Sequence, residues 1–281
     1  MIIDFHTHIL PDEFRTGRAR FADQDRTFGA LFADPAARTA SAEDLVAEME
    51  RSGVDVSVAL GYGWTDPAAA SLSNDYLLDA ARRFPGRIVP FCSVNPVWGA
   101  DAVREAERCA AAGARGIGEL HADTQGFDLT DPDSLAPLMG LAREAGLTVV
   151  VHGSEPVGHT YPGKGTTTPD RLAALAAAFP GVRFVFAHWG GGLPFYALMP
   201  EIASTLQNAY FDSAATSLLY RPEVFAVACG AVGPGQLLFG SDYPLLRQGR
   251  VLREARGAGL SDGELAALLG GNAARLLSLE M

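Results

Sequence analysis

The feature that most constrains the fold is a repeated alternation between short apolar runs and helix-like segments. Runs of this length without polar alternation are typical of parallel strands whose two faces are both buried. Eight strand–helix units in 281 residues predict an α/β protein, a (β/α)8 TIM barrel, as a single domain over residues 1–281. The runs lie at residues 2–5, 54–60, 87–93, 115–120, 147–151, 183–187, 209–213 and 236–241.

An open doubly wound sheet is the alternative architecture. That fold more usually carries a glycine-rich phosphate turn after its first strand, where this chain instead has the sequence HTHIL. The segments between the runs have the residues typical of helix starts and ends, which agrees with either fold. Residues 41–53, for example, begin with a capping serine and end at glycine. The tail beyond the eighth run reads as two short helices, and residues 9–40 read as a long irregular first loop. Long loops in compact domains are often functional, so we expect 9–40 to cover the site as a lid.

Composition limits the partners. The net charge of −11 argues against nucleic acid and anionic membranes as partners, because both require a basic surface. We therefore expect the partner to be a small-molecule substrate. Three cysteines without a CxxC pair favour reduced thiols, and we expect a cytoplasmic protein. The apolar start of the chain is too short for a signal peptide, and no apolar run reaches the length of a membrane-spanning helix, so we expect neither feature.

Polar residues gather where the predicted strands end. His6 and His8 share one face of the first run, because side chains two positions apart on a strand point the same way. In a barrel, the carboxyl ends of all strands meet at the rim that carries the chemistry. The other candidates at that rim are Glu119, His152, His188 and Asp242.

This set predicts a metal site. Adjacent buried imidazoles need partners and repel one another when both are protonated, whereas a divalent cation binds imidazole nitrogen and carboxylate oxygen together. The donors suffice for one catalytic metal or for two bridged metals. Glu119 has two interpretations, as a ligand or as an acceptor that orients a ligating histidine.

Further residues are candidates for substrate contact. Arg15 and Arg18 in the first loop would clamp a carboxylate in a bidentate manner, although solvated arginines are the commoner occurrence. His159 and Tyr161 lie in a glycine- and proline-rich segment after His152, and Trp189 directly follows His188. These three side chains are candidates for the wall of the substrate pocket.

Several ordered motifs carry a resemblance to a known family. DFHTH, VHGSE, FAHWGGGLPF, FGSDYP and GNAARLL resemble the amidohydrolase superfamily, and more narrowly the amidohydrolase-related branch of hydrolases, lactonases and non-oxidative decarboxylases. The resemblance implies a barrel with a divalent metal, usually zinc. It also implies His6, His8, His152 and Asp242 as metal ligands, with His188 beside the metal. Relatives are often dimers, which makes a homodimer the implied assembly.

The resemblance leaves the number of metals open. Binuclear members often bridge their metals with a carboxylated lysine on the fourth strand, and this chain has Glu119 there instead. A mononuclear site is the first expectation. In the binuclear alternative, Glu119 bridges the metals, and His152 and His188 bind the second one.

The leading functional hypothesis is metal-dependent hydrolysis of an ester, lactone or amide carbonyl. Asp242 would accept the proton of the attacking water, and His188 would stabilise the oxyanion. The alternative is a metal-dependent decarboxylase (a carboxy-lyase) of an aromatic or unsaturated carboxylic acid, for which the first-loop arginines would hold the carboxylate. A metal-dependent phosphoesterase is a third class, and the acidic chain argues against its acting on nucleic acid.

Overall fold

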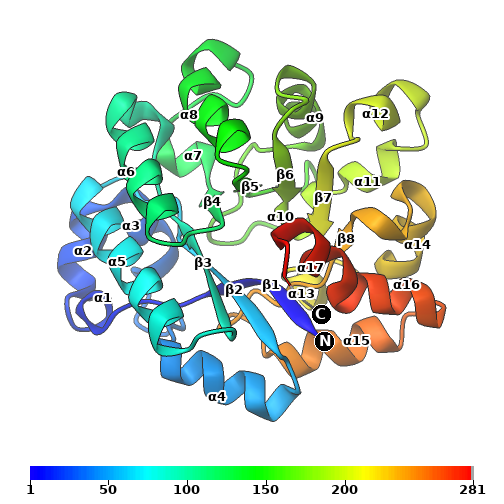
Figure 1. The fold of residues 1–281 in the computed structure, drawn as a ribbon, viewed down its shortest axis with the longest axis horizontal. Helices are drawn as coiled ribbons and strands as arrows, with labels where there is room; N and C mark the ends of the chain where they lie inside the picture. Colours follow the sequence, from blue (N-terminus) through cyan, green and yellow to red (C-terminus); the bar gives the residue numbers. More distant parts are fainter. Residues whose placement is uncertain (280–281) are drawn as a thin grey trace.

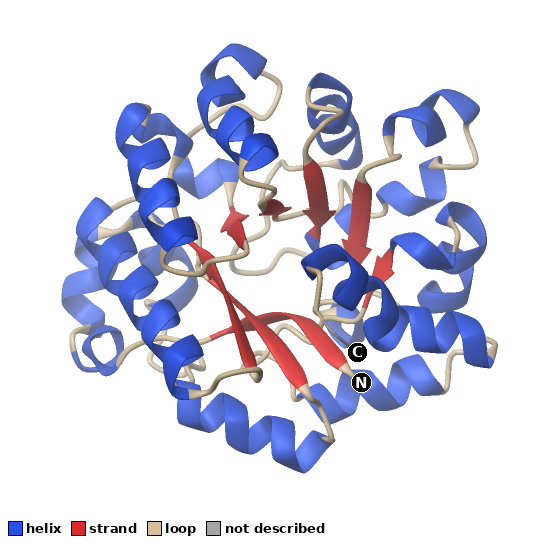
Figure 2. Ribbon diagram, viewed as in Figure 1, coloured by secondary structure: helices blue, strands red, loops and turns tan. Residues whose placement is uncertain are grey.

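The computed structural model describes residues 1–279, and within them the eight predicted runs all contain a strand. The strands pair in parallel and in chain order, with the helices around them (Figures 1 and 2). This arrangement confirms the (β/α)8 barrel. The strands are β1 (Ile3–His8), β2 (Val56–Leu60), β3 (Ile88–Cys92), β4 (Gly116–Leu120), β5 (Thr148–Val151), β6 (Arg183–Phe186), β7 (Ala209–Asp212) and β8 (Leu237–Leu238).

Backbone hydrogen bonds between β1 and the residues that follow β8 close the barrel. The amide of Phe5 donates to the carbonyl of Phe239 at 2.7 Å, and the amide of His8 donates to that of Tyr243 at 2.7 Å. Because every strand runs in the same direction, all carboxyl ends meet at one rim, which we call the mouth.

Helices cover the outside of the strands, as Figure 2 shows. Helix α4 begins as the sequence predicts, and the Ser41 hydroxyl and the Asp44 carboxylate cap each other's backbone amides. Gly53 ends the helix with a φ of 70°, a conformation that glycine adopts without a steric penalty. The main outer helices are α4 (Ala42–Ser52), α5 (Pro67–Arg83), α6 (Ala100–Ala111), α8 (Pro132–Glu144), α9 (Pro169–Ala178), α14 (Val224–Val232) and α15 (Gln248–Arg256).

Shorter elements fill the connections and the tail. The tail has two short α-helices, as predicted. They are joined by a π-helical turn, which the sequence analysis did not predict. Within residues 1–279, none of the helices has both the length and the apolar character that crossing a bilayer requires. The shorter elements are α7 (Ala122–Gln125), α10 (Ala187–Gly190), α11 (Leu193–Tyr196), α12 (Pro200–Thr205), α13 (Thr216–Leu219), α16 (Asp262–Ala266), α17 (Asn272–Leu277), η1 (Pro96–Trp98), η2 (Pro234–Gln236) and the π-helix η3 (Ala267–Gly271).

The core has a layer inside the barrel and a layer between strands and helices. Phe5, Val58, Phe91 and Val150 are fully buried in the inner layer, and Phe5 packs its ring edge against Phe91. Each fully buried side chain of this kind contributes about 1.5–3 kcal/mol relative to exposure. The rigid inner layer fixes the strand ends and therefore the side chains at the mouth.

Residues 9–40 are not an irregular loop, and that expectation is wrong. They contain three helices, α1 (Asp12–Thr16), α2 (Arg18–Gln24) and α3 (Arg26–Phe32), which we call the cover. The helices are too short for a periodic signal and are held by tertiary packing instead. Phe14 is fully buried and stacks on Phe21 and Trp64, with ring centroids 4.3 and 5.2 Å away.

Candidate metal centre

The two histidines of β1 point into the mouth together. Both rings are almost fully buried, and Nε2 of His6 lies 3.0 Å from Nε2 of His8. Two nitrogens this close cannot both carry a proton without a clash. They can share a proton, or both can bind one cation.

Glu119 at the end of β4 lies between two sets of imidazoles. Its Oε2 atom is 3.6 Å from Nε2 of His6 and 3.7 Å from Nε2 of His8. Its Oε1 atom is 3.0 Å from Nδ1 of His152 and 3.3 Å from Nε2 of His188. The structure therefore forms two three-residue ligand groups that share this one carboxylate.

Asp242 follows β8 and faces the first pair of histidines. Its Oδ1 atom lies 3.8 Å from Nε2 of His6 and 3.6 Å from Nε2 of His8. The residue has a φ of 65°, and its amide donates to the carbonyl of His6 at 2.9 Å. A left-handed non-glycine residue is uncommon, and here it turns the carboxylate toward the mouth.

His188 follows β6 and also has left-handed backbone geometry, with a φ of 56°. Its amide donates to Oδ1 of Asp212 at 3.0 Å. Its ring Nδ1 lies 3.3 Å from the carbonyl of Ala214, which can only accept, so Nδ1 carries a proton. Its Nε2 is thereby directed toward Glu119.

Asp212 at the end of β7 is a site residue that the sequence analysis missed. Its Oδ2 atom lies 2.8 Å from Nδ1 of His6, and its side chain is fully buried. A carboxylate that accepts from Nδ1 leaves the Nε2 lone pair of the imidazole free for a metal. The available signal was its place at the end of the seventh run, which matches the places of the other rim residues.

Charges within the cluster shift one another's pKa values. Burial raises the pKa of Glu119, but the neighbouring imidazoles outweigh burial and hold that pKa well below its ordinary value. Burial lowers the pKa of His6, but Asp212 and Glu119 outweigh it and raise that pKa well above normal. Burial, with a contribution from His6, lowers the pKa of His8 to about 4. Without a metal, shared protons therefore balance the carboxylates.

The donor set fits a divalent cation. Nε2 of His152 is buried and has no hydrogen-bond partner within the described residues, as expected of a nitrogen whose partner is a metal ion. His6, His8, His152, Asp242 and Glu119 would hold the ion. Imidazole and carboxylate together suit Zn²⁺, Mn²⁺, Fe²⁺ or Co²⁺.

Aromatic rings form a wall against two of these imidazoles. Tyr62 stacks on His8 at 4.0 Å between centroids, and Phe32 of the cover packs edge-on against Tyr62 at 5.1 Å. On the other side, His121 stacks on His152 at 4.4 Å. The sequence analysis did not single out Tyr62, although it follows the second run by only two residues.

Arg15 and Arg18, the proposed carboxylate clamp, have other contacts in the structure. Arg15 is exposed and pairs with Asp12. Arg18 donates to the backbone carbonyls of Phe32, Asp34 and Ala37 and so ties the cover together.

The three proposed wall residues differ in their surroundings. Trp189 is fully buried and donates to Thr216 at 2.9 Å, which places it in the core. His159 is exposed, whereas Tyr161 is half-buried and donates to Glu155 at 2.9 Å.

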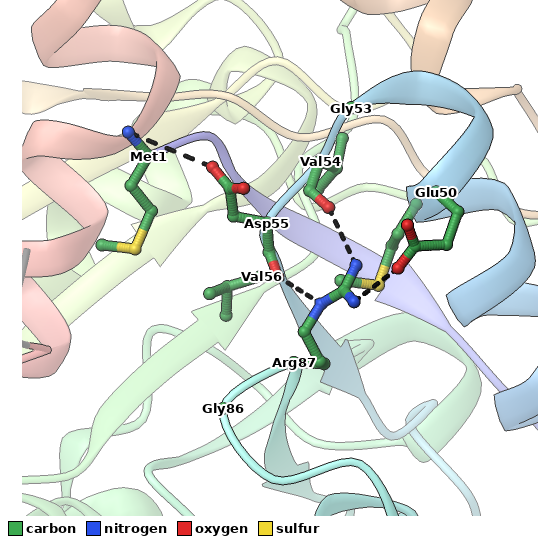
Figure 3. A pocket seen from close by; sticks show the side chains of 9 residues that line it. Met1, Glu50, Gly53, Val54, Asp55, Val56, Gly86 and Arg87 are labelled. Atoms are coloured by element: carbon green, nitrogen blue, oxygen red, sulfur yellow. Dashed lines mark hydrogen bonds and ion pairs between the residues drawn. The ribbon is translucent and has the colours of Figure 1, made fainter.

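A separate hollow of about 570 Å³ lies at the amino-terminal ends of β1 and β2 (Figure 3). Its charged groups already have partners. Arg87 reaches Glu50 at 2.5 Å and the carbonyl of Asp55 at 2.8 Å, and the Met1 amine lies 4.0 Å from the Asp55 carboxylate. This hollow is at the end of the barrel opposite the mouth, and none of the candidate metal ligands lines it.

Comparison with known proteins identifies the family. The family model described as amidohydrolase matches residues 3–279, so the chain belongs to the amidohydrolase family. The resemblance expected from the sequence motifs is thereby confirmed.

Solved structures share the fold. The chain is similar to a 5-carboxyvanillate decarboxylase from Sphingomonas paucimobilis, with 18% identity, coverage of 99% of each chain and a TM-score of 0.80. It is similar to a second such decarboxylase, from Novosphingobium aromaticivorans, complexed with manganese and a nitrobenzoic acid, with 17% identity, coverage of 99% and 96% and a TM-score of 0.78. It also resembles an amidohydrolase II, with 20% identity, coverage of 99% and 100% and a TM-score of 0.78.

Proposed function

We propose that the chain is a metal-dependent, non-oxidative decarboxylase of an aromatic or unsaturated carboxylic acid. The observation that carries this proposal is the aromatic wall against the candidate metal ligands, where Tyr62 stacks on His8 and Phe32 backs Tyr62. Flat rings next to a metal-binding cluster suit a planar acid. Two similar folds belong to decarboxylases of aromatic acids, which supports the same reaction here.

The phenol of Tyr62 in this wall is uncharged. Burial raises the pKa of Tyr62 well above its ordinary value, and the charges of Asp242 and Glu119 add to the effect. Tyr62 therefore stays protonated even in alkaline solution, and no phenolate charge develops beside an acidic substrate.

The reaction balances with one proton supplied to the substrate. The bond between the ring carbon and the carboxylate breaks, the electron pair stays on the ring carbon, and carbon dioxide leaves. A bound divalent metal supplies positive charge that holds the acid and stabilises the developing electron pair.

The chain's own residues handle the proton. His188 is the proposed donor, because the Nδ1 proton is committed to Ala214 and the Nε2 proton is the one free to move. Burial lowers the pKa of His188, but Glu119 outweighs burial and raises it to about 9. Asp242, with 14% of its side chain exposed, is the member of the cluster placed to return a proton from solvent.

Hydrolysis of an ester, lactone or amide is the second candidate. The specific observation in its favour is the pair of ligand groups that share Glu119, the arrangement that a bridged two-metal hydrolase requires. In that reaction Asp242 takes the proton of the attacking water and passes it to the leaving group, while His188 stabilises the oxyanion.

One experiment compares both candidates. Protein stripped with a chelator and reloaded with Mn²⁺ or Zn²⁺ is incubated with hydroxylated benzoic acids and, separately, with lactones and esters. Decarboxylation gives carbon dioxide and the ring-protonated product in equal amounts, and His188→Asn abolishes it. Turnover of lactones or esters without carbon dioxide from any acid overturns the first proposal in favour of the second.

Metal stoichiometry adds an independent test. A bridged pair gives two equivalents per chain, and Glu119→Gln then lowers the value to one. A single equivalent in both proteins contradicts the two-metal arrangement.

A further inference from the structure

His121 is a buried histidine that neither proposed reaction uses. It directly follows β4, caps the short helix α7, and is 5% exposed. Its ring lies flat against the ring of His152, with centroids 4.4 Å apart and planes 14° apart. His152 is the candidate ligand whose Nε2 has no partner within residues 1–279.

Hydrogen bonds fix the orientation of the His121 ring. Its Nε2 lies 2.7 Å from the carbonyl of Gly163, which can only accept, so Nε2 carries the proton. Its Nδ1 accepts from the amide of Thr124 at 3.5 Å. The ring is therefore neutral, in one tautomer, and held at both edges.

Gly163 belongs to the segment 153–168, which connects β5 to α9 and begins directly after His152. The segment is also held by Arg171 of α9, which donates to the Thr166 hydroxyl at 2.8 Å, and by the carboxylate of Asp123. That carboxylate accepts from the amide of Thr166 at 2.8 Å, its hydroxyl at 2.7 Å and the Thr167 hydroxyl at 3.2 Å. Of these anchors, His121 is the one that also packs against a candidate metal ligand.

We propose that His121 is a positioning residue that couples metal binding at His152 to docking of the 153–168 segment. Metal binding fixes the His152 ring, and the stacked His121 ring then keeps its donor aimed at Gly163. Linkage requires the reverse effect as well, so a docked segment raises metal affinity. This inference depends on the metal site alone and not on which reaction the site performs.

Three variants separate the two contacts of His121. His121→Phe keeps a flat ring against His152 and loses the donor to Gly163. His121→Gln keeps a donor and loses the ring, and His121→Ala loses both. His159→Ala, which removes an exposed imidazole from the same segment, is the matched control.

The readouts do not depend on turnover. Zinc affinity is measured by competition with a chromogenic chelator, and docking is measured by hydrogen exchange of the amides of residues 163–167. In the wild-type protein, zinc slows exchange of these amides. His121→Ala and His121→Gln bind zinc about 2- to 12-fold more weakly, the factor equivalent to one aromatic pair.

His121→Phe is the decisive variant. It keeps the stack and loses only the coupling, so zinc no longer slows exchange in the segment, and its zinc affinity falls by no more than the factor by which zinc slows exchange in the wild-type segment. His159→Ala behaves as wild type in both measurements. Thermal unfolding of each variant establishes that it is folded, and if His121→Ala does not fold, the other two variants carry the test.

Two results overturn the proposal. One is zinc binding by His121→Gln or His121→Ala as tight as that of wild type, and the other is exchange in the wild-type segment that zinc leaves unchanged. If the coupling is found but the protein decarboxylates none of the acids tested, the proposed function is wrong and this inference still holds.

Discussion

Replacing Asp212 with asparagine tests how the chain prepares an imidazole for a metal. Oδ2 of Asp212 accepts from Nδ1 of His6 at 2.8 Å, and Oδ1 accepts from the amides of His188 and Ala214 at 3.0 Å each. In Asp212→Asn, those two backbone donors hold the single carboxamide oxygen. The amide NH₂ then faces Nδ1 of His6.

That orientation reverses the tautomer of His6. Nδ1 becomes the acceptor, the proton moves to Nε2, and the nitrogen that faces His8 and Glu119 loses its lone pair. Loss of such a partner costs about 10- to 100-fold in metal affinity, or about 1.4–2.7 kcal/mol. We expect the upper end of this range, because the replacement both removes a charge and selects the wrong tautomer.

The assay is zinc competition against a chromogenic chelator, with nitrogen NMR of histidine-labelled protein to read the tautomer of His6. Asp25→Asn is the matched control, because Asp25 is a buried carboxylate that accepts from three backbone amides and touches no candidate ligand. The control loses stability and keeps its zinc affinity. Zinc affinity of Asp212→Asn within about threefold of wild type would refute the tautomer argument.

Three further predictions concern the cover and the 153–168 segment. Phe14→Ala removes a ring stacked against Phe21 and Trp64 and lowers the free energy of unfolding by about 3–5 kcal/mol in urea titrations; a loss under about 1 kcal/mol would show that the cover is not cooperative with the barrel. Arg18→Ala removes three hydrogen bonds to carbonyls, which costs about 1–3 kcal/mol and leaves zinc affinity unchanged; a rise in KM without loss of stability would restore Arg18 as a substrate clamp. Burial raises the pKa of Asp123, but the hydrogen bonds from Thr166 outweigh burial and lower that pKa below its ordinary value of 3.8. Its stabilising contribution is therefore present above pH 3.8 and lost as the pH falls through the lowered value, so the stability gap between wild type and Asp123→Asn narrows in acid; a gap that stays constant from pH 6 to pH 3 contradicts it.

The barrel and the convergence of rim residues were predictable from the sequence. Buried parallel strands leave long apolar runs, and their shared direction places the residues that follow the runs at one rim. His6 and His8 could be assigned to one face from strand geometry alone. The structure brings them together with Glu119, His152, His188 and Asp242.

The remaining features depend on contacts between segments far apart in the chain. The cover helices of 9–40 are stabilised by packing between aromatic rings, which leaves no periodic pattern in such short helices. The partners of Arg18 are backbone carbonyls 14 to 19 residues away, so its sequence context could not distinguish a tether from a clamp. The roles of Tyr62 and His121 become visible only when each ring is seen stacked on a ligand imidazole.

Anomalous diffraction from manganese-loaded crystals, recorded at the manganese absorption edge, tests the metal centre most directly. The expected result is a strong peak bordered by Nε2 of His6, Nε2 of His8 and the carboxylate of Asp242. A well-ordered mouth without such a peak, or a peak bound elsewhere on the chain, would contradict the account.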